Sequence, residues 1–208
     1  MQQEKGMRPL LTIMIALGWF AIMAQFYLII ENRITSIPET AIRFFSFFTI
    51  LTNILVALCC TILLLNYNSK WRNFFSNKNT LTAIAVYITI VGVVYNLILR
   101  FLWNPEGLQW IVDELLHSVI PILFIILWLL YIPKRRLQLK SVFAWLLYPL
   151  VYLIFIIIRG SFSGFYPYPF IDVNKLGYNK VIVNSTGMLA AFLVTSVLFV
   201  LIDRFKKV

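Results

Sequence analysis

The sequence predicts an all-α polytopic membrane protein with six transmembrane helices and with both termini in the cytoplasm. The chain has 208 residues, of which 61% are hydrophobic and only 12% are charged, whereas about a quarter of the residues of a soluble domain are charged. Six apolar stretches are each long enough to cross a hydrocarbon core of about 30 Å, which takes about 20 helical residues. They lie roughly at residues 10–30, 43–66, 80–102, 112–132, 141–159 and 178–202.

The first stretch follows a short basic tail, as the apolar part of a signal peptide does. Its length and the lack of a small-x-small cleavage site favour a retained transmembrane helix. Little chain remains between the six stretches, and it contains no low-complexity linker or obvious repeat, so we expect a single domain over residues 1–208.

The distribution of lysine and arginine predicts the orientation. With a cytoplasmic N-terminus, twelve of the eighteen lysines and arginines fall on inner segments, and the positive-inside rule then puts both ends in the cytoplasm. These twelve are Lys5, Arg8, Lys70, Arg72, Lys78, Lys134, Arg135, Arg136, Lys140, Arg204, Lys206 and Lys207. The net charge of +10 follows from this topology and from attraction to anionic lipid, so we expect a multi-pass protein of the cell (plasma) membrane and no nucleic-acid partner.

The metal-binding and redox residues are few. Cys59 and Cys60 are neighbours, and adjacent residues do not readily form an unstrained disulfide, so we interpret them as packing thiols. A zinc or haem site usually needs several ligands, and the chain has one histidine, so we predict no metal and no cofactor. Redox or quinone chemistry lacks the second ligand or cofactor motif that it would need.

The single histidine, His117, lies in the fourth apolar stretch. An imidazole in hydrocarbon costs free energy unless it has a partner or a function, so His117 is either a satisfied buried histidine or a functional residue. Asp113 is four residues earlier on the same helix face, where we expect it to orient the ring. Pro121 is four residues later and has no N–H for the His117 carbonyl, so the helix should open or kink there.

Position along each stretch predicts depth, at about 1.5 Å per residue. Thr49 lies about six residues, or about 9 Å, below the start of the second stretch at Arg43, and His117 lies five or six residues into the fourth. Both are therefore expected in one layer, with a polar pocket that lipid can reach in the outer half of the bilayer. Other polar residues near this layer are Gln25, Thr52, Asn53, Asn96, Arg100, Arg159, Asn184, Ser185 and Thr186. Taken singly, each has a structural explanation in helix packing or snorkelling.

The longest outer connection runs from Gly160 to Gly177 and contains the segment Phe165-Tyr-Pro-Tyr-Pro-Phe170. Its three glycines and two prolines argue against a continuous helix. The aromatic residues indicate either an interfacial belt or a lid over the pocket, in which Tyr168 would contact a substrate.

A hydroxyl group beside a general base is the chemistry that these residues permit, because a threonine paired with a histidine can form and release an acyl intermediate. Three segments then carry a family resemblance through their order and spacing. They are Phe44-Phe-Ser-Phe-Phe-Thr-Ile-Leu-Thr-Asn53, Leu115-Leu-His-Ser-Val-Ile-Pro121 with the following Trp128-Leu-Leu-Tyr-Ile-Pro-Lys134, and Arg159-Gly-Ser-Phe-Ser-Gly-Phe-Tyr-Pro-Tyr-Pro-Phe170. From the second stretch into the sixth, the chain resembles the androgen-induced/FAR-17a-like family of six-helix membrane proteins, and more closely its bacterial branch.

The animal members of that family cleave fatty acid esters of hydroxy fatty acids with an intramembrane threonine and histidine. The resemblance implies Thr49 as the nucleophile, His117 as the base and a lipophilic acyl-ester substrate among the membrane lipids. The proline after the histidine is one residue closer here than in the animal pattern, and Ser46 and Thr52 are alternative hydroxyls. The alternative is that bacterial members keep the fold but act on other lipids, or on none.

Supporting roles follow from residue chemistry. An asparagine would donate to the oxyanion, the carboxylate of Asp113 would orient His117, and an arginine would bind a substrate carboxylate. The candidate asparagines are Asn53, Asn96 and Asn184, and the candidate arginines are Arg100 and Arg159. The rival hypothesis is a non-catalytic lipid-binding protein or a small carrier that uses the same pocket, with Pro121 and Pro149 breaking its helices.

Overall fold

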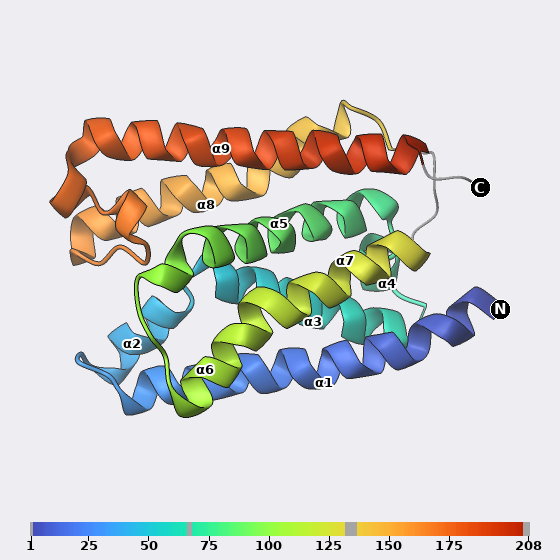
Figure 1. Cartoon of the computed structure of the whole chain (residues 1–208), viewed down its shortest axis with the longest axis horizontal. Coiled ribbons are helices and arrows are strands. Elements are labelled where there is room, and N and C mark those ends of the chain that lie inside the picture. Colours follow the sequence, from blue (N-terminus) through green and yellow to red (C-terminus); the bar gives the residue numbers. More distant parts are fainter. Residues whose placement is uncertain (1, 66–67, 132–136, 206–208) are drawn as a thin grey trace. The chain divides into compact units, whose positions relative to one another are not determined.

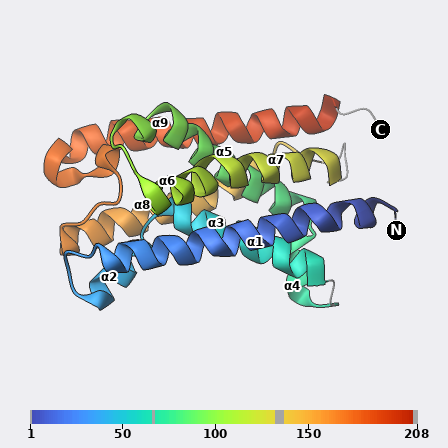
Figure 2. The same cartoon turned by 60° about the horizontal axis from the view of Figure 1, so that its bottom comes forward.

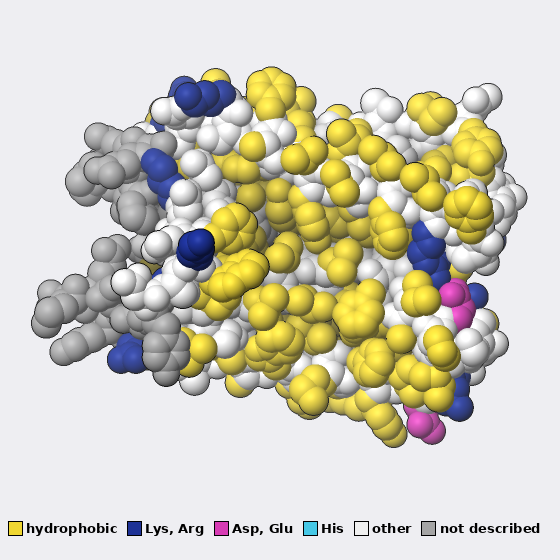
Figure 3. All heavy atoms as spheres, turned by 180° about the vertical axis from the view of Figure 1, so that it is seen from behind, with side chains coloured by type: hydrophobic (Ala, Val, Ile, Leu, Met, Phe, Trp, Pro, Cys, Tyr) yellow, Lys and Arg dark blue, Asp and Glu magenta, His cyan; other side chains and the backbone are white. Residues whose placement is uncertain are grey.

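The computed structural model describes residues 2–65, 68–131 and 137–205, and every regular element in these ranges is helical. Within the described residues, six helices are long and apolar enough to cross a membrane, as the sequence predicts for a multi-pass membrane protein. Their ranges are Gly6–Glu31, Phe48–Leu65, Lys78–Phe101, Gly107–Tyr131, Ser141–Ser163 and Val173–Phe205. Figure 3 shows hydrophobic side chains along the helices and Lys and Arg side chains near their ends. The predicted inner cations that lie outside the described ranges are Lys134, Arg135, Arg136, Lys206 and Lys207.

The chain divides into two compact units, residues 1–134 and 135–208, and each is described by itself. The expectation of one domain over the whole chain stays a prediction. The first unit contains α1 (Gln2–Glu31), α2 (Ile37–Phe44), α3 (Phe48–Leu65), α4 (Lys70–Phe75), α5 (Lys78–Leu97), η1 (Leu99–Phe101), α6 (Gly107–Glu114), η2 (Leu115–Val119) and α7 (Ile120–Tyr131).

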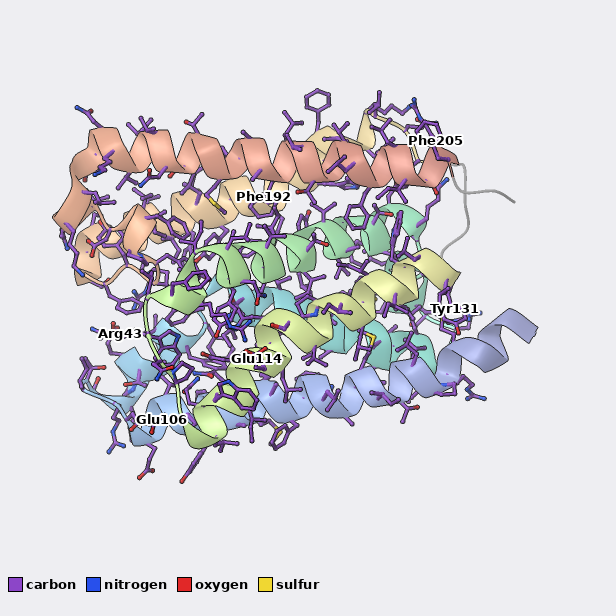
Figure 4. The ribbon with its side chains drawn as sticks, viewed as in Figure 1. Arg43, Glu106, Glu114, Tyr131, Phe192 and Phe205 are labelled. Atoms are coloured by element: carbon purple, nitrogen blue, oxygen red, sulfur yellow. The ribbon has the colours of Figure 1, made fainter. Side chains whose placement is uncertain are left out.

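The first unit is built from antiparallel neighbours. α1 packs along α3, α3 along α5, and α7 along both α5 and α1 (Figures 1 and 2). At the end of α7, the Tyr131 hydroxyl donates to Gly6 O of α1 at 2.9 Å (Figure 4). Fully buried residues from all four long helices form the core, among them Leu11, Met14, Val56, Ile88 and Phe124.

The second predicted span is interrupted near its start. The apolar run from Arg43 predicts one helix, but α2 ends at Phe44 and α3 begins at Phe48. In this break, the Ser46 hydroxyl donates to Ile42 O, four residues back, at 2.7 Å. Thr49 therefore lies in the first turn of α3 and not six residues inside a continuous helix.

The fourth span begins earlier than the sequence predicts. α6 starts at Gly107, which has a φ of 57°, a left-handed conformation that glycine adopts without steric cost. His117 is therefore ten residues into this span, whereas Thr49 is one residue into α3. The prediction that the two residues lie equally far from the starts of their helices is therefore wrong. Their common layer stays a prediction, and the contacts that relate them are described below.

The second unit contains α8 (Ser141–Ser163), η3 (Pro169–Ile171) and α9 (Val173–Phe205), and α8 packs along α9. α8 continues four residues beyond its predicted end at residue 159 and stops at Gly164, whose φ of 68° suits a glycine after a helix. Gly177, with a φ of 73°, interrupts α9. The ring of Tyr166 lies against Gly160 so closely that a Cβ there would be 2.1 Å from it.

Candidate functional site

The helix of the fourth span changes register at its histidine. α6 is followed by the π-helical turn η2, Leu115–Val119, and then by α7. The N–H of Ile120 donates to Leu115 O, five residues back, where an α-helix would bond four residues back. Pro121 follows at once and has no N–H, so it cannot restore the regular bonding. The opening that the proline predicts is therefore this π turn, and single π turns occur frequently at functional sites.

Two carbonyls of the π turn lack their usual helical donors. For Leu116 O, the N–H four residues on is bonded to Leu115, and the residue five positions on is Pro121. For His117 O, the residue four positions on is Pro121 itself. A buried carbonyl without a donor costs roughly 1–3 kcal/mol, so this turn needs donors from other helices.

Asparagines from two neighbouring helices supply these donors. Asn53 of α3 donates from Nδ2 to Leu116 O at 3.2 Å. Asn96 of α5 donates from Nδ2 to His117 O at 3.3 Å. Each amide also donates, at 2.9 Å, to the carbonyl four residues back in its own helix. The two asparagines therefore attach the π turn to α3 on one side and to α5 on the other.

α5 approaches the π turn closely at Gly92. A Cβ at this position would lie 3.1 Å from His117 O and 3.3 Å from Pro121 Cβ. Glycine permits such a close approach between backbones. It brings Asn96, one turn further along α5, within hydrogen-bond distance of the same carbonyl.

Asn53 and Asn96 are predicted as oxyanion donors, and in the structure their amides donate to main-chain carbonyls. A side-chain amide has two N–H donors. Those of Asn53 meet two main-chain carbonyls, and those of Asn96 meet two carbonyls and, at 3.4 Å, Ser118 Oγ. These donors already pair the backbone of the π turn, and the predicted role of the two amides towards an oxyanion stays a prediction.

The His117 ring is oriented by a main-chain group. Its Nδ1 lies 2.9 Å from Asp113 O, and a carbonyl oxygen only accepts hydrogen bonds, so in the neutral ring Nδ1 carries the proton. Nε2 then has the lone pair, as a general base requires. Asp113 thus contacts the ring through its carbonyl and not, as the sequence predicts, through its carboxylate. The ring folds back along its own helix, where the carbonyl four residues earlier is the nearest acceptor.

The Asp113 carboxylate is buried, at 4% exposure, and has other partners. Gln109 donates from Nε2 to its Oδ1 at 3.0 Å and to Gln25 Oε1 at 2.8 Å. The Tyr95 hydroxyl donates to Oδ2 at 3.4 Å. The Tyr95 ring also stacks on His117, with centroids 4.0 Å apart and planes 12° from parallel. Tyr95 and Asp113 therefore fix both the plane and the tautomer of the imidazole.

The sequence does not predict Tyr95 and Gln109 as part of the site. Two weak signals point to them. Gln109 lies four residues before Asp113, on the same face of α6, and Tyr95 lies beside the half-buried Asn96 on α5. Neither spacing distinguishes a site residue from an ordinary packing residue.

Arg100 is engaged within the first unit. It forms an ion pair with Glu114, which is labelled in Figure 4, and donates from Nη1 to Asn96 Oδ1 at 2.7 Å. Its Cζ lies 5.8 Å from the centroid of the Tyr95 ring. A substrate carboxylate at Arg100 would compete with Glu114, and the predicted binding role stays a prediction.

Thr49 is connected to the π turn through Asn53. It is 7% exposed. The Asn53 amide donates both to Thr49 O and to Leu116 O, so the helical turns that carry Thr49 and His117 share one side-chain amide. Of the alternative hydroxyls, Ser46 donates to Ile42 O of α2, whereas Thr52 Oγ1 is fully buried and has no hydrogen-bond partner.

The remaining predicted site residues belong to the second unit. Arg159 donates from Nη1 to Phe165 O at 3.5 Å. The Tyr168 ring stacks on Phe170 with centroids 5.3 Å apart, and Asn184 donates from Nδ2 to Phe170 O at 2.9 Å. These contacts order the connection between α8 and α9, and the roles of Arg159, Tyr168 and Asn184 towards a substrate stay predictions.

Among the described residues, no group of three or more His, Cys, Asp and Glu side chains is placed to bind a metal ion. Cys59 and Cys60 are both buried free thiols. Comparison of the chain with protein-family models, with curated proteins and with solved structures gives no match. The chemistry of the site therefore has to be inferred from its own geometry.

Proposed function

We propose that the protein is an intramembrane hydrolase of fatty acyl esters, with Thr49 as the nucleophile and His117 as the general base. The orientation of the His117 ring carries this proposal. With Nδ1 at 2.9 Å from a carbonyl, Nε2 is the basic nitrogen, on a turn that shares Asn53 with the turn of Thr49. Membership of the androgen-induced/FAR-17a-like family is part of the proposal, and it suggests fatty acid esters of hydroxy fatty acids as substrates.

The reaction would proceed in two half-reactions. His117 Nε2 takes the proton of Thr49 Oγ1 as that oxygen attacks the acyl carbonyl, and the ester bond breaks as the leaving alcohol takes this proton. Water then attacks the acyl-Thr49 carbonyl and gives a proton to Nε2. The proton passes to Thr49 Oγ1 as the fatty acid leaves.

The position of Thr49 in α3 supports this assignment. The N-terminal end of a helix carries the positive end of the helix dipole, so it stabilises nearby negative charge. Thr49 is the second residue of α3. Negative charge that develops on its oxygen or on the tetrahedral intermediate would lie at this end. Electrostatic stabilisation of such charge is usually the largest single contribution to acyl-transfer catalysis.

Labelling by a fluorophosphonate probe tests the nucleophile. Thr49→Ala and His117→Ala are each expected to abolish labelling while leaving the yield of folded protein unchanged. The matched control is Thr89→Ala, because the Thr89 hydroxyl donates to its own helix at 2.6 Å. Labelling that persists in Thr49→Ala and disappears in Thr52→Ala would assign the nucleophile to Thr52. Full labelling in Thr49→Ala, Thr52→Ala and His117→Ala alike would overturn the proposal.

A further inference from the structure

The face of α3 that contacts η2 contains two buried polar atoms that have no hydrogen-bond partner. They are Thr52 Oγ1 and Asn53 Oδ1, and both residues are 0% exposed. Buried polar atoms in folded proteins are nearly always paired, and each exception needs an explanation. A bound molecule that pairs both atoms is one such explanation.

The neighbours of Asn53 fix the orientation of its amide. Nδ2 faces Thr49 O at 2.9 Å and Leu116 O at 3.2 Å. The reversed amide would place Oδ1 against these two carbonyl oxygens, which have no proton to donate. Oδ1 is therefore the acceptor that lacks a partner, and the group that pairs it must be a hydrogen-bond donor.

Thr52 differs from other threonines in the helices of the first unit. Thr61, Thr82 and Thr89 each donate to the carbonyl four residues back, at 2.6 to 2.7 Å, which is the usual way in which a buried helical threonine is satisfied. Thr52 makes no such bond. Its hydroxyl can therefore both donate to and accept from another molecule.

The two unpaired atoms lie on the helix face that also carries Thr49. Residues 49, 52 and 53 are spaced i, i+3 and i+4, which places them within about 100° of the α3 circumference. Asn53 contacts Leu116 O, so this face is directed at the π turn that carries His117. A molecule bound there would lie beside the residues of the proposed reaction.

We propose that Thr52 and Asn53 bind a small hydroxylic molecule, which donates a hydrogen bond to Asn53 Oδ1 and exchanges one with Thr52 Oγ1. The hydroxyl could come from water or from the alcohol group of a lipid. This binding site goes beyond the proposed hydrolysis, because it depends only on buried atoms of α3.

If the protein is a hydrolase, a water bound here is suitably placed to attack acyl-Thr49. Its oxygen bonds to the acyl carbon, its proton goes to His117 Nε2, and Thr49 Oγ1 takes that proton as the ester bond breaks.

Thermal unfolding of Thr52→Val tests the site. Valine has nearly the shape of threonine without the hydroxyl, so the variant removes the hydrogen bonds and keeps the packing. In lauryldimethylamine oxide, a detergent without hydroxyl groups, we expect its melting temperature to fall further below the wild type than that of Thr89→Val, the matched control. A melting temperature equal to or above that of the control would overturn the proposal, because removal of an unpaired buried hydroxyl is expected to stabilise the fold.

Decanol, with decane as its control, identifies the source of the hydroxyl. If a lipid alcohol binds, decanol raises the melting temperature of the wild type and of Thr52→Ser, whereas decane does not, and Thr52→Val does not respond. If water binds, decanol gives no specific response, yet Thr52→Val is still destabilised. Neither measurement involves ester turnover, so the site can be confirmed even where Thr49→Ala keeps full probe labelling and the hydrolase proposal fails.

Discussion

At the scale of single residues, the partner of His117 decides its chemistry. A main-chain carbonyl fixes the tautomer of the imidazole without adding a charge, and Asp113 O does this at 2.9 Å. A carboxylate in the same place would favour the protonated ring and would place an ion pair in a low-dielectric environment, where desolvation is costly. The observed arrangement therefore suits a base that must be neutral before it reacts.

We expect His117 to be the tautomer protonated at Nδ1. The chain contains one histidine, so isotope labelling of histidine gives the nitrogen resonances of this residue alone. Their chemical shifts report which nitrogen carries the proton. The same tautomer is expected in Asp113→Asn, because the contact is made by the main chain of residue 113. A ring protonated at Nε2, or a change of tautomer in Asp113→Asn, would contradict this account.

In the proposed ester hydrolysis, Tyr95 should act as a positioning residue for His117. Tyr95→Leu removes the stack on His117, whose centroids are 4.0 Å apart, and is expected to lower kcat by up to about 100-fold, the scale of a misplaced catalytic group. KM should change little. Tyr95→Phe keeps the stack and should keep most of kcat, and Tyr87→Phe on the same helix is the control. An unchanged kcat in Tyr95→Leu would exclude this role.

The sequence identifies which polar residues are buried, but it does not identify their partners. Asn53 is buried and Asn96 is half-buried, both within apolar helices, as the sequence suggests. The carbonyls to which they donate lose their helical donors through a register change in a third helix. That register change follows from Pro121, which the sequence does contain. The pairing of two asparagines with two particular carbonyls depends on helix packing, which spacing along one chain cannot supply.

At the scale of elements, the π turn depends on three helices together. Pro121 removes the regular donor, Gly92 allows α5 to approach, and two asparagines supply the missing hydrogen bonds. π turns are rare and occur mostly as single turns inside α-helices, frequently at functional sites. The cost of keeping this one is offset only if all the neighbours are in place.

Gly92→Ala should therefore destabilise the protein. The added Cβ would lie 3.1 Å from His117 O, and overpacking of this kind costs about 1–3 kcal/mol. Gly187→Ala is the control, because a Cβ there meets nothing within 4 Å and alanine is favoured over glycine in a helix by about 0.5–1 kcal/mol. Unfolding in detergent measures both variants. A Gly92→Ala variant as stable as Gly187→Ala would exclude the close approach.

The lengths of the apolar stretches were enough to predict six spanning helices, because the hydrocarbon thickness sets the number of residues that each needs. The ends of the helices were less predictable. The break before Phe48 falls within a continuous apolar run, so hydropathy does not reveal it. Gly107 extends the fourth span by a turn that contains polar residues, which hydropathy places outside the membrane.

At the scale of the whole molecule, the surface indicates a lipid environment. Large hydrophobic side chains such as Met23, Leu97 and Ile122 are 57 to 71% exposed along the spanning helices. In water, so much exposed apolar surface would lead to association. Lys and Arg side chains near the helix ends are typical of the headgroup regions, where their charges stay solvated (Figure 3).

The excess of cations on one set of loops should place the N-terminus in the cytoplasm. A cysteine introduced at one position at a time tests this. Native Cys59 and Cys60 are 0% exposed, so they give little background with a membrane-impermeant maleimide. Glu106→Cys should react in intact cells, and Asn68→Cys should react only after the membrane is made permeable. Both positions are exposed loop residues, so a difference between them reports the side of the membrane and not burial. The reverse pattern would put the basic loop around Lys70 outside the cell and would leave the positive charge of this chain without an explanation.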